Sequence, residues 1–380
     1  MISKLESYLN SKPLYFDKID FNIVKEAWEI ISKEITLPYV IHIIGTNGKG
    51  STGRFLASFL TQLNKKTLHY SSPHILEFNE RIWINNQNST DEDLDKGHEK
   101  LQKHLPLYLL ERLTYFEYTT LVALVLSDKL DYLVLEAGLG GEFDATNVVK
   151  NDLTLLTTIG LDHQNFLGNT IKEITLTKVK SCDNRIIVGY QQDSDVYNYI
   201  RELFENNREI IFLKSKNIDS SNYNNNMPAY LENNLKHTLF TLKYLNLPIK
   251  DFNLPTLFGR YQNITNNITI DVGHNPLAAK VISKELENSS KKIDLIYNSY
   301  EDKDYKNVLK ILKNHINKIY IIPCDDKRVV DIDILKITIE KLDIPYDDFS
   351  IDKINSDDNY LVFGSFLVVE EFLKQFNYDK

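Results

Sequence analysis

A glycine-rich loop at residues 45–51 contains the residue types that hold a triphosphate. Its sequence, Gly-Thr-Asn-Gly-Lys-Gly-Ser, follows an apolar run at 40–44 and precedes a helical pattern. Glycines let backbone N–H groups close around phosphates, Lys49 supplies a positive charge, and the Ser51 hydroxyl can reach a bound metal ion. A helix start adds partial positive charge. A glycine-rich turn with a solvated lysine is the competing explanation, but the flanking strand and helix favour a phosphate-binding loop.

Further polar residues follow other apolar runs. Ser72 comes after the run at 66–71, Glu136 ends the run at 132–136, and His163 follows an apolar segment. Ligands of open α/β sheets bind outside the carboxyl ends of the strands. Mg²⁺ usually takes one or two protein carboxylates beside substrate phosphates, which suits Glu136 with a serine hydroxyl. From the residues alone, a capping carboxylate explains Glu136 equally well, and a hydrogen-bonded loop histidine explains His163 better than a metal ligand does.

The elements that position these residues alternate between apolar runs and helical patterns. This alternation predicts an α/β fold with a mainly parallel sheet. The expected strands lie at 40–44, 66–71, 132–136, 153–159, 185–190, 268–271, 293–297, 319–322 and 360–363. The expected helices lie at 54–63, 116–130 and 233–245, and a further helix begins at Pro276. The polar stretch at 220–226 predicts a surface loop.

A chain of 380 residues is long enough for two domains. A new strand–loop–helix series begins near residue 267. We therefore expect a phosphate-loop domain over residues 1–258, a linker at 259–265, and a smaller Rossmann-like α/β domain over 266–380.

The composition excludes several classes of protein. A formal net charge of −9 argues against nucleic acid or an anionic membrane as the main partner. The two cysteines, Cys182 and Cys324, have no metal-binding spacing and suit a reducing compartment. No apolar run approaches the ~18 residues of a membrane span, and the N-terminus shows no signal peptide. We expect a cytoplasmic protein.

Seven groups of short motifs occur in one order along the chain: GTNGKGS, SSPH with FNERI, TYFEYTT, LEAGLGG with DATN, GLDH, GRYQ and DVGHNP. In this order the chain resembles the folylpolyglutamate synthase/dihydrofolate synthase family, a branch of the Mur ligase superfamily. The resemblance runs from Gly45 to His274, and YEDKD and FGSF extend it towards the C-terminus. It implies a monomeric, ATP-dependent ligase whose substrates are ATP, L-glutamate and dihydropteroate or a folate.

The same resemblance implies the reaction. ATP phosphorylates the carboxylate of a pterin-linked acid, and the amino group of L-glutamate then displaces phosphate from the acyl phosphate. Phosphorylation is needed because a carboxylate repels nucleophiles and has a poor leaving group. Phosphoryl transfer depends mainly on alignment and charge neutralisation, which is the role of Lys49 and of metal ions.

The resemblance also implies roles for individual residues. The ATP-binding residues would be Gly48, Lys49, Gly50, Ser51, Asn234, Arg260 and Asp271. The Mg²⁺ ligands would be Ser72, Glu136 and His163, with K⁺ as a further candidate ion. The substrate-binding residues would be Thr114, Tyr115, Phe116, Glu117, Phe143, Asp144, Ala145 and His274. Lys49, His163 and Lys178 would be catalytic, with Lys178 carried as a carbamate, although the sequence alone favours a solvated helical lysine at 178.

Two departures from the family pattern leave questions open. Glu142 stands where the family usually has Arg or Lys, which puts the substrate range in doubt. The segment around Lys178 also differs from the family's Glu-Lys-Ala-Gly. Two other functions compete: a cell-wall Mur-type amino-acid ligase, and a P-loop NTPase without ligase chemistry. The SSPH–FNERI and TYFEYTT segments favour the folate branch, and an NTPase leaves Glu136 and His163 unexplained.

Overall fold

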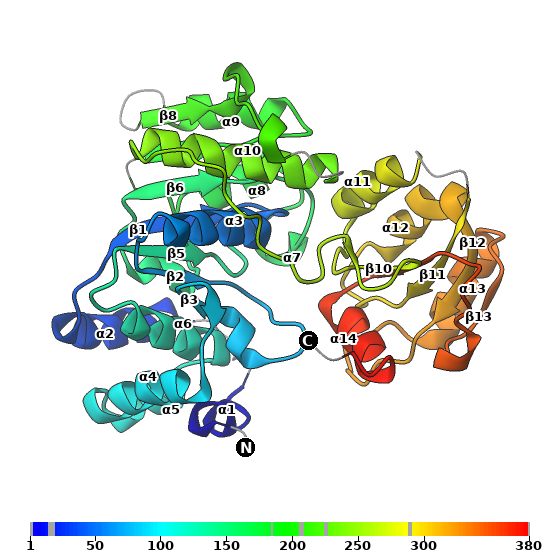
Figure 1. Ribbon diagram of the computed structural model, residues 1–380. Helices are drawn as coiled ribbons and strands as arrows, with labels where there is room; N and C mark the ends of the chain where they lie inside the picture. The colour runs from blue at the N-terminus through cyan, green and yellow to red at the C-terminus, as the bar shows by residue number, and fades with distance from the viewer. Residues whose placement is uncertain are drawn as a thin grey trace. The chain divides into compact units, whose positions relative to one another are not determined.

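The chain divides into two compact units, each with its own sheet (Figure 1). A computed structural model describes residues 3–13, 20–183, 185–204, 209–223, 227–287 and 291–378. Unit 1 comprises residues 1–227 and 231–255, and unit 2 comprises 228–230 and 256–380. The division therefore falls three residues before the expected boundary at 258. Residues 262–263 of the expected linker form a short strand within unit 2. In the expected loop at 220–226, residues 221–223 form a 3-10 turn and 224–226 lie outside the described residues.

Unit 1 is built on a mostly parallel sheet of eight strands in the order β4-β3-β2-β5-β1-β6-β7-β8. The pairs from β2 through β5, β1, β6 and β7 to β8 are parallel, and β3 and β4 continue the sheet as antiparallel strands. The strands are β1 (Tyr39–Ile44), β2 (Thr67–Tyr70), β3 (Ile82–Ile84), β4 (Gln87–Asn88), β5 (Tyr132–Glu136), β6 (Leu153–Leu156), β7 (Arg185–Val188) and β8 (Glu209–Phe212).

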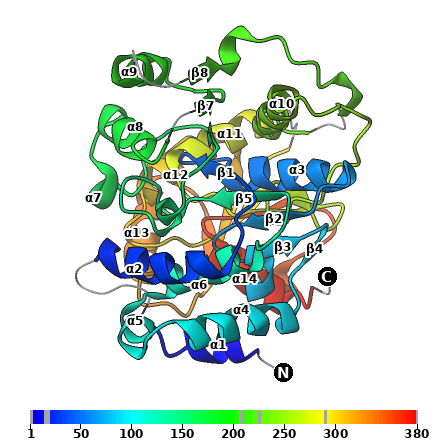
Figure 2. The same ribbon diagram turned by 90° about the vertical axis from the view of Figure 1, so that its left-hand side faces the viewer.

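Helices cover both faces of this sheet, which is why its central strands are apolar throughout rather than alternating. Figure 2 shows α3 and α10 on one face and α2, α6, α8 and α9 on the other. The helices of unit 1 are α1 (Lys4–Leu9), α2 (Phe21–Ile31), α3 (Lys49–Gln62), α4 (Asp91–His104), α5 (Leu107–Arg112), α6 (Tyr115–Leu126), α7 (Gln164–Leu167), α8 (Ile171–Val179), α9 (Asp195–Phe204) and α10 (Ala229–Tyr244).

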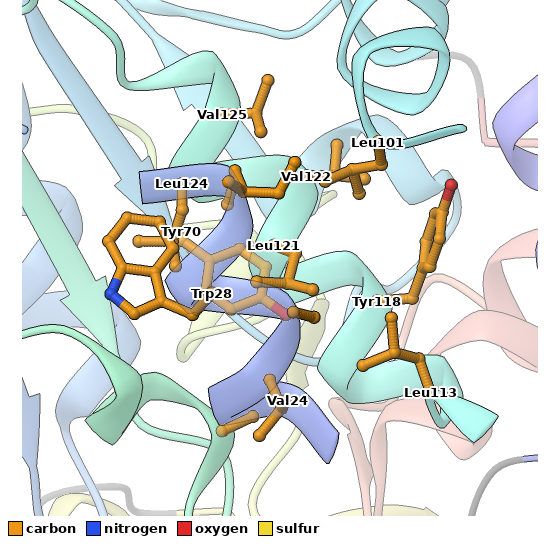
Figure 3. Close-up of a cluster of buried hydrophobic side chains, with 14 of the residues drawn as sticks. Val24, Trp28, Tyr70, Leu101, Leu113, Tyr118, Leu121, Val122, Leu124 and Val125 are labelled. Carbon is orange, nitrogen blue, oxygen red and sulfur yellow. The ribbon is translucent and has the colours of Figure 1, made fainter. Parts of the chain in front are cut away.

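The largest core of unit 1 lies between the β2–β5–β1 part of the sheet and the helices α2, α4 and α6 (Figure 3). Trp28 and Val24 from α2 meet Leu121 and Leu124 from α6 there, and Tyr70 reaches in from β2. Residues 117–125 of helix α6 are all buried, so this stretch is enclosed on every side and its second half is entirely apolar. This core fixes the position at which α6 begins, next to the ends of the strands.

Unit 2 has a six-stranded sheet in the order β13-β12-β11-β14-β10-β9, parallel except for β9. Its strands are β9 (Gln262–Asn263), β10 (Ile268–Asp271), β11 (Ile293–Tyr297), β12 (Ile316–Ile321), β13 (Tyr346–Asp348) and β14 (Tyr360–Phe363). Its helices are α11 (Pro276–Leu286), α12 (Tyr305–Leu312), α13 (Ile332–Lys341) and α14 (Phe366–Gln375). The α/β fold class expected from the sequence is confirmed in both units.

Every strand expected from the sequence is present. Strands β2, β6 and β7 are shorter than expected, β1 and β12 begin earlier, and the other four have the expected bounds. The short strands β3, β4, β8, β9 and β13 were not expected from the sequence, because they contain too few residues for a clear pattern. Helix α3 begins at Lys49 rather than at the expected residue 54, because the glycine loop itself turns into the helix.

Candidate active site

The phosphate loop leads directly into helix α3. Gly48 is the N-cap of α3 and has a φ of +90°, a conformation that a residue with a side chain rarely adopts. The space that a Cβ would need at Gly48 is also taken, since it would lie 2.8 Å from Oδ1 of Asn234. Nδ2 of Asn234 donates a hydrogen bond to Oγ of Ser51 at 2.8 Å. Helix α10 thus delivers Asn234 to the phosphate loop.

Lys49 lies beside Glu136. Strand β5 pairs in parallel with β1, and the register sets Glu136 opposite Ile43, just before the phosphate loop. Lys49 Nζ is 4.0 Å from Glu136 Oε1, and both side chains are largely buried. The same ammonium group contacts the carbonyl oxygens of Gly45 at 3.3 Å and Thr46 at 3.4 Å. The loop therefore holds a cation and a carboxylate together, as phosphoryl transfer with a metal ion requires.

Lys178 is one of the most deeply buried polar side chains, with 2 % of its surface exposed. Its Nζ donates a hydrogen bond to the carbonyl oxygen of Leu139 at 2.5 Å. Burial and, to a smaller extent, the charge of Lys49 lower the pKa of Lys178 to about 7, although Asp144 and Asp162 act in the opposite direction. The view of Lys178 as a solvated helical lysine is wrong, because helix α8 turns this residue towards the glycine turn after β5.

The turn after β5 is shaped around Lys178 and Phe116. Gly140 has a φ of +77°, and a Cβ there would lie 3.2 Å from Lys178 Nζ. A Cβ on Gly138 would lie 2.6 Å from Cζ of Phe116. These glycines let one backbone turn approach both side chains closely. Lys178 was predicted to be catalytic and Phe116 to bind the substrate. Both side chains therefore flank the same turn.

Asp144 accepts hydrogen bonds from residues of its own loop. Its carboxylate accepts hydrogen bonds from the backbone N–H of Gly140 at 2.8 Å and from the hydroxyl of Thr146 at 2.6 Å. Nε2 of the buried His42 contacts the same hydroxyl. Phe143 is 68 % exposed and Ala145 is buried, so of these three predicted substrate contacts Phe143 alone offers a large free surface.

His163 occupies a special backbone position. It has a φ of +49° and is the N-cap of α7, and its Nε2 lies 3.9 Å from Oδ1 of Asp162. Within the described residues, no group of three or more His, Cys, Asp or Glu side chains could hold a metal ion. The expected set of Ser72, Glu136 and His163 contains a hydroxyl, one carboxylate and one imidazole. Mg²⁺ accepts such a sparse set where substrate phosphates and water supply further oxygens.

The Ser72 loop is held by two adjacent residues that the sequence analysis did not single out. The carboxylate of Glu80 accepts hydrogen bonds from the backbone N–H groups of Ile75, Leu76 and Glu77 at 2.8–3.0 Å. Nε of Arg81 donates to Nδ1 of His74 at 2.8 Å. Both lie in the FNERI motif, whose paired charges after SSPH were the available signal.

Four residues predicted to bind the substrate lie at the start of α6. Thr114 and Glu117 form a reciprocal capping box, which accounts for both side chains. Tyr115 and Phe116 open the helix, and the guanidinium carbon of Arg81 lies 5.3 Å from the centre of the Tyr115 ring. Of the four, the two aromatic residues remain available for contact with a flat ligand.

In unit 2, Asp271 ends β10 and gathers three donors. Its carboxylate accepts hydrogen bonds from Tyr230 Oη at 3.0 Å, from the N–H of Tyr261 at 2.9 Å and from the N–H of Gly273 at 2.7 Å. Burial raises the pKa of Asp271, and Arg260 opposes this rise. Tyr230 is a third residue that was not singled out from the sequence, because it lies 41 positions from Asp271.

The other residues expected to act in unit 2 lie near Asp271 along the chain. The guanidinium of Arg260 stacks over the ring of Phe366, with its carbon 5.0 Å from the ring centre. Nδ1 of His274 contacts the carbonyl oxygen of Val272 at 3.1 Å, and Asn275 caps α11. Arg260, Asp271 and His274, which were predicted from the sequence, all lie in unit 2.

Comparison with known proteins decides the family. A curated dihydrofolate synthase/folylpolyglutamate synthase from Haemophilus influenzae is 31% identical to this chain, covering 96% of it and 95% of the relative. The chain belongs to the dihydrofolate synthase/folylpolyglutamate synthase family. No family model matches it. The resemblance inferred from the seven motif groups is confirmed.

Solved structures of this family share the fold. The folylpolyglutamate synthetase of Helicobacter pylori matches with a TM-score of 0.78 and 36% identity over 98% of both chains. A Yersinia pestis folylpolyglutamate synthase/dihydrofolate synthase, solved with AMPPNP and a Mn ion, matches with a TM-score of 0.81 and 25% identity, over 98% of this chain and 97% of that one. Among the described residues, no helix is long and apolar enough to cross a membrane.

Proposed function

We propose that this member of the dihydrofolate synthase/folylpolyglutamate synthase family couples L-glutamate to a pterin-linked carboxylate at the expense of ATP. We assign it both activities: synthesis of dihydrofolate from dihydropteroate, and addition of glutamate to a reduced folate. The supporting observation is the cluster of Lys49, Glu136 and the buried Lys178 where the phosphate loop and the turn after β5 meet.

ATP activates the acid in the first step. The γ-phosphoryl group passes to a carboxylate oxygen of the acid, giving an acyl phosphate and ADP. Lys49 neutralises charge on the phosphoryl group, and the first N–H groups of α3 face the phosphates. Asn234 holds the Ser51 hydroxyl in place for the metal or a phosphate. The amino group of L-glutamate then attacks the acyl carbon, phosphate leaves, and the amine loses a proton as the amide forms.

We assign the metal site to Ser72, Glu136 and His163. A divalent ion there would neutralise triphosphate charge and polarise the γ-phosphate. The Yersinia pestis relative, solved with AMPPNP and Mn, supports nucleotide with a divalent ion in this family. Lys49 lies close enough to Lys178 for its charge to lower the pKa of Lys178. A carbamate on Lys178 would replace a cation that repels Lys49 with an anion that attracts it.

The remaining assignments stay predictions. Phe143, Tyr115 and Phe116 would contact the pterin-linked acid, and Arg260, Asp271 and His274 would contact nucleotide or glutamate. Residues 1–258 would form the ATP-binding domain and 266–380 the smaller ligase domain. A monomeric state, a cytoplasmic location and a role for K⁺ are expectations from the sequence.

A paired assay tests the function. Purified protein is supplied with ATP, Mg²⁺ and L-glutamate, and with either dihydropteroate or tetrahydrofolate, and the products are identified by mass. We expect one glutamate to be added to each acid, and phosphate release to need both acid and amino acid. Phosphate release without an acid would support an NTPase instead. Turnover with a UDP-linked muramoyl acid but with neither pterin would support a Mur-type ligase.

A further inference from the structure

Arg81 is a buried cation that has no carboxylate partner among the described residues. Only 9% of the residue is exposed. Its one hydrogen bond from the side chain runs from Nε to the neutral acceptor Nδ1 of His74. The guanidinium forms no ion pair with any carboxylate in the part of the chain that the structure describes. A buried charge is costly unless it is paired, and the two terminal nitrogens of Arg81 have donors left to satisfy.

Aromatic rings fix the orientation of this guanidinium. Its carbon lies 5.3 Å from the ring centre of Tyr115 and 5.7 Å from that of Phe78. Stacking on rings holds the planar fork and leaves its edge available, which is the geometry that binds a carboxylate through two hydrogen bonds. Tyr115 is also one of the residues we assign to the pterin-linked acid.

Arg81 acts electrostatically on the aromatic residues beside it. It lowers the pKa values of Tyr70 and Tyr115 against the raising effect of burial. Lys49, which lies beside Glu136, is the cation that we assign to the transferred phosphoryl group.

We propose that Arg81 binds the non-reacting carboxylate of an acid substrate that already carries glutamate. This inference rests on the proposed function and names a residue that separates its two activities. Dihydropteroate has a single carboxylate, which must be the one that reacts. A folate has two on its glutamate, so one can react while the other pairs with Arg81. Arg81 is then a specificity determinant for extension of the glutamate chain.

Equilibrium binding tests the proposal without relying on turnover. Dihydropteroate and dihydrofolate differ by one glutamate, and their dissociation constants are measured calorimetrically with a non-hydrolysable ATP analogue and Mg²⁺. Arg81→Gln keeps an N–H donor near His74 but removes the charge. We expect it to weaken dihydrofolate binding by about 10- to 100-fold and dihydropteroate binding by less than about threefold. Arg81→Lys, with charge but no fork, should fall between.

An exposed arginine elsewhere in unit 1, which also lies over an aromatic ring, provides the control. Arg201 stacks over Phe212 with its carbon 4.7 Å from the ring centre and donates to the neutral Oδ1 of Asn198. Arg201→Gln should leave both dissociation constants unchanged. Equal losses for the two ligands in Arg81→Gln, or no loss for either, would overturn the role of Arg81 alone. A wild-type protein that binds neither ligand would overturn the proposed function and this inference with it.

Discussion

Nδ2 of Asn234 donates a hydrogen bond to Oγ of Ser51 at 2.8 Å, although the two residues are 183 positions apart in the sequence. A second contact repeats this link one turn further on, where the hydroxyl of Thr238 donates to the carbonyl oxygen of Thr52 at 3.2 Å. Helix α10 is therefore tied to the first turn of α3. The shape of the phosphate loop depends on this helix as well as on its own glycines.

Asn234→Ala should weaken ATP binding without affecting the acid substrate. Removing the donor leaves the Ser51 hydroxyl with only its 3.3 Å hydrogen bond to the carbonyl oxygen of Gly48, so we expect the KM for ATP to rise by about tenfold. Asn234→Asp keeps the size but sets a carboxylate beside the triphosphate, and should raise that KM further. Steady-state kinetics with ATP and acid varied separately measures both. Equal effects on the two KM values would contradict a local role for Asn234.

Lys49→Ala should nearly abolish turnover. The variant loses the charge that neutralises the transferred phosphoryl group, and we expect kcat to fall by at least about 10²- to 10³-fold. The side chain packs against loop carbonyls rather than in the apolar core, so the melting temperature should change little. Near-normal phosphate release would show that the loop does not serve phosphoryl transfer.

His163→Ala should alter the dependence on Mg²⁺. Loss of a ligand should raise the Mg²⁺ concentration for half-maximal activity by about tenfold or more. His104→Ala is the control, since His104 lies at the end of α4 and neighbours Glu34. An unchanged Mg²⁺ titration of the His163 variant would remove this residue from the metal site.

Lys178→Met should stabilise the protein near neutral pH and inactivate it. The folded-state pKa of Lys178 is about 7, below the ordinary value of 10.5. Between these values the unfolded chain binds more protons at this residue, so stability rises with pH across that window. The methionine variant has no amine to bury, so it avoids the free-energy cost of burying the protonated form of Lys178. Its gain in melting temperature should be largest near pH 7 and shrink towards pH 10. A variant less stable than the wild type at pH 7 would contradict the prediction that the buried amine of Lys178 destabilises the fold.

The same pKa predicts how carbamylation of Lys178 depends on pH. Carbon dioxide adds to the neutral amine, and the neutral fraction grows as pH rises through about 7. Activity at low bicarbonate should therefore fall below pH 7, and added bicarbonate should restore part of it. Lys180, exposed and paired with Glu142 at 2.8 Å, supplies the control. Lys180→Met should keep the bicarbonate response, and mass spectrometry of the native protein should place the carbamate on Lys178.

Asp271→Asn should raise the KM for ATP if unit 2 contributes to nucleotide binding. The substitution removes the charge but keeps one acceptor, so we expect a rise of about tenfold. Tyr230→Phe removes one donor to Asp271 and leaves its two backbone donors in place. This control should have the smaller effect. A KM for ATP unchanged in Asp271→Asn would exclude a nucleotide contact by this carboxylate.

The sequence alone determined which strands carry the chemistry. The phosphate loop is one continuous segment, and the polar residues at Ser72, Glu136 and His163 each follow an apolar run. Such local order is visible because burial on both faces makes a parallel strand apolar throughout. The motif order also indicated the family, which the similarity to known proteins confirmed.

Only the tertiary structure decided which of these residues meet. The pairing of β1 with β5 sets Lys49 beside Glu136, and the packing of α8 buries an amine that its own helix pattern leaves exposed. The roles of Arg81 and Tyr230 depend on the residues that surround them in the fold, although the charged pair in the FNERI motif had pointed to Arg81. Burial and the absence or presence of a counter-charge are properties of packed segments distant in sequence, and no local pattern encodes them.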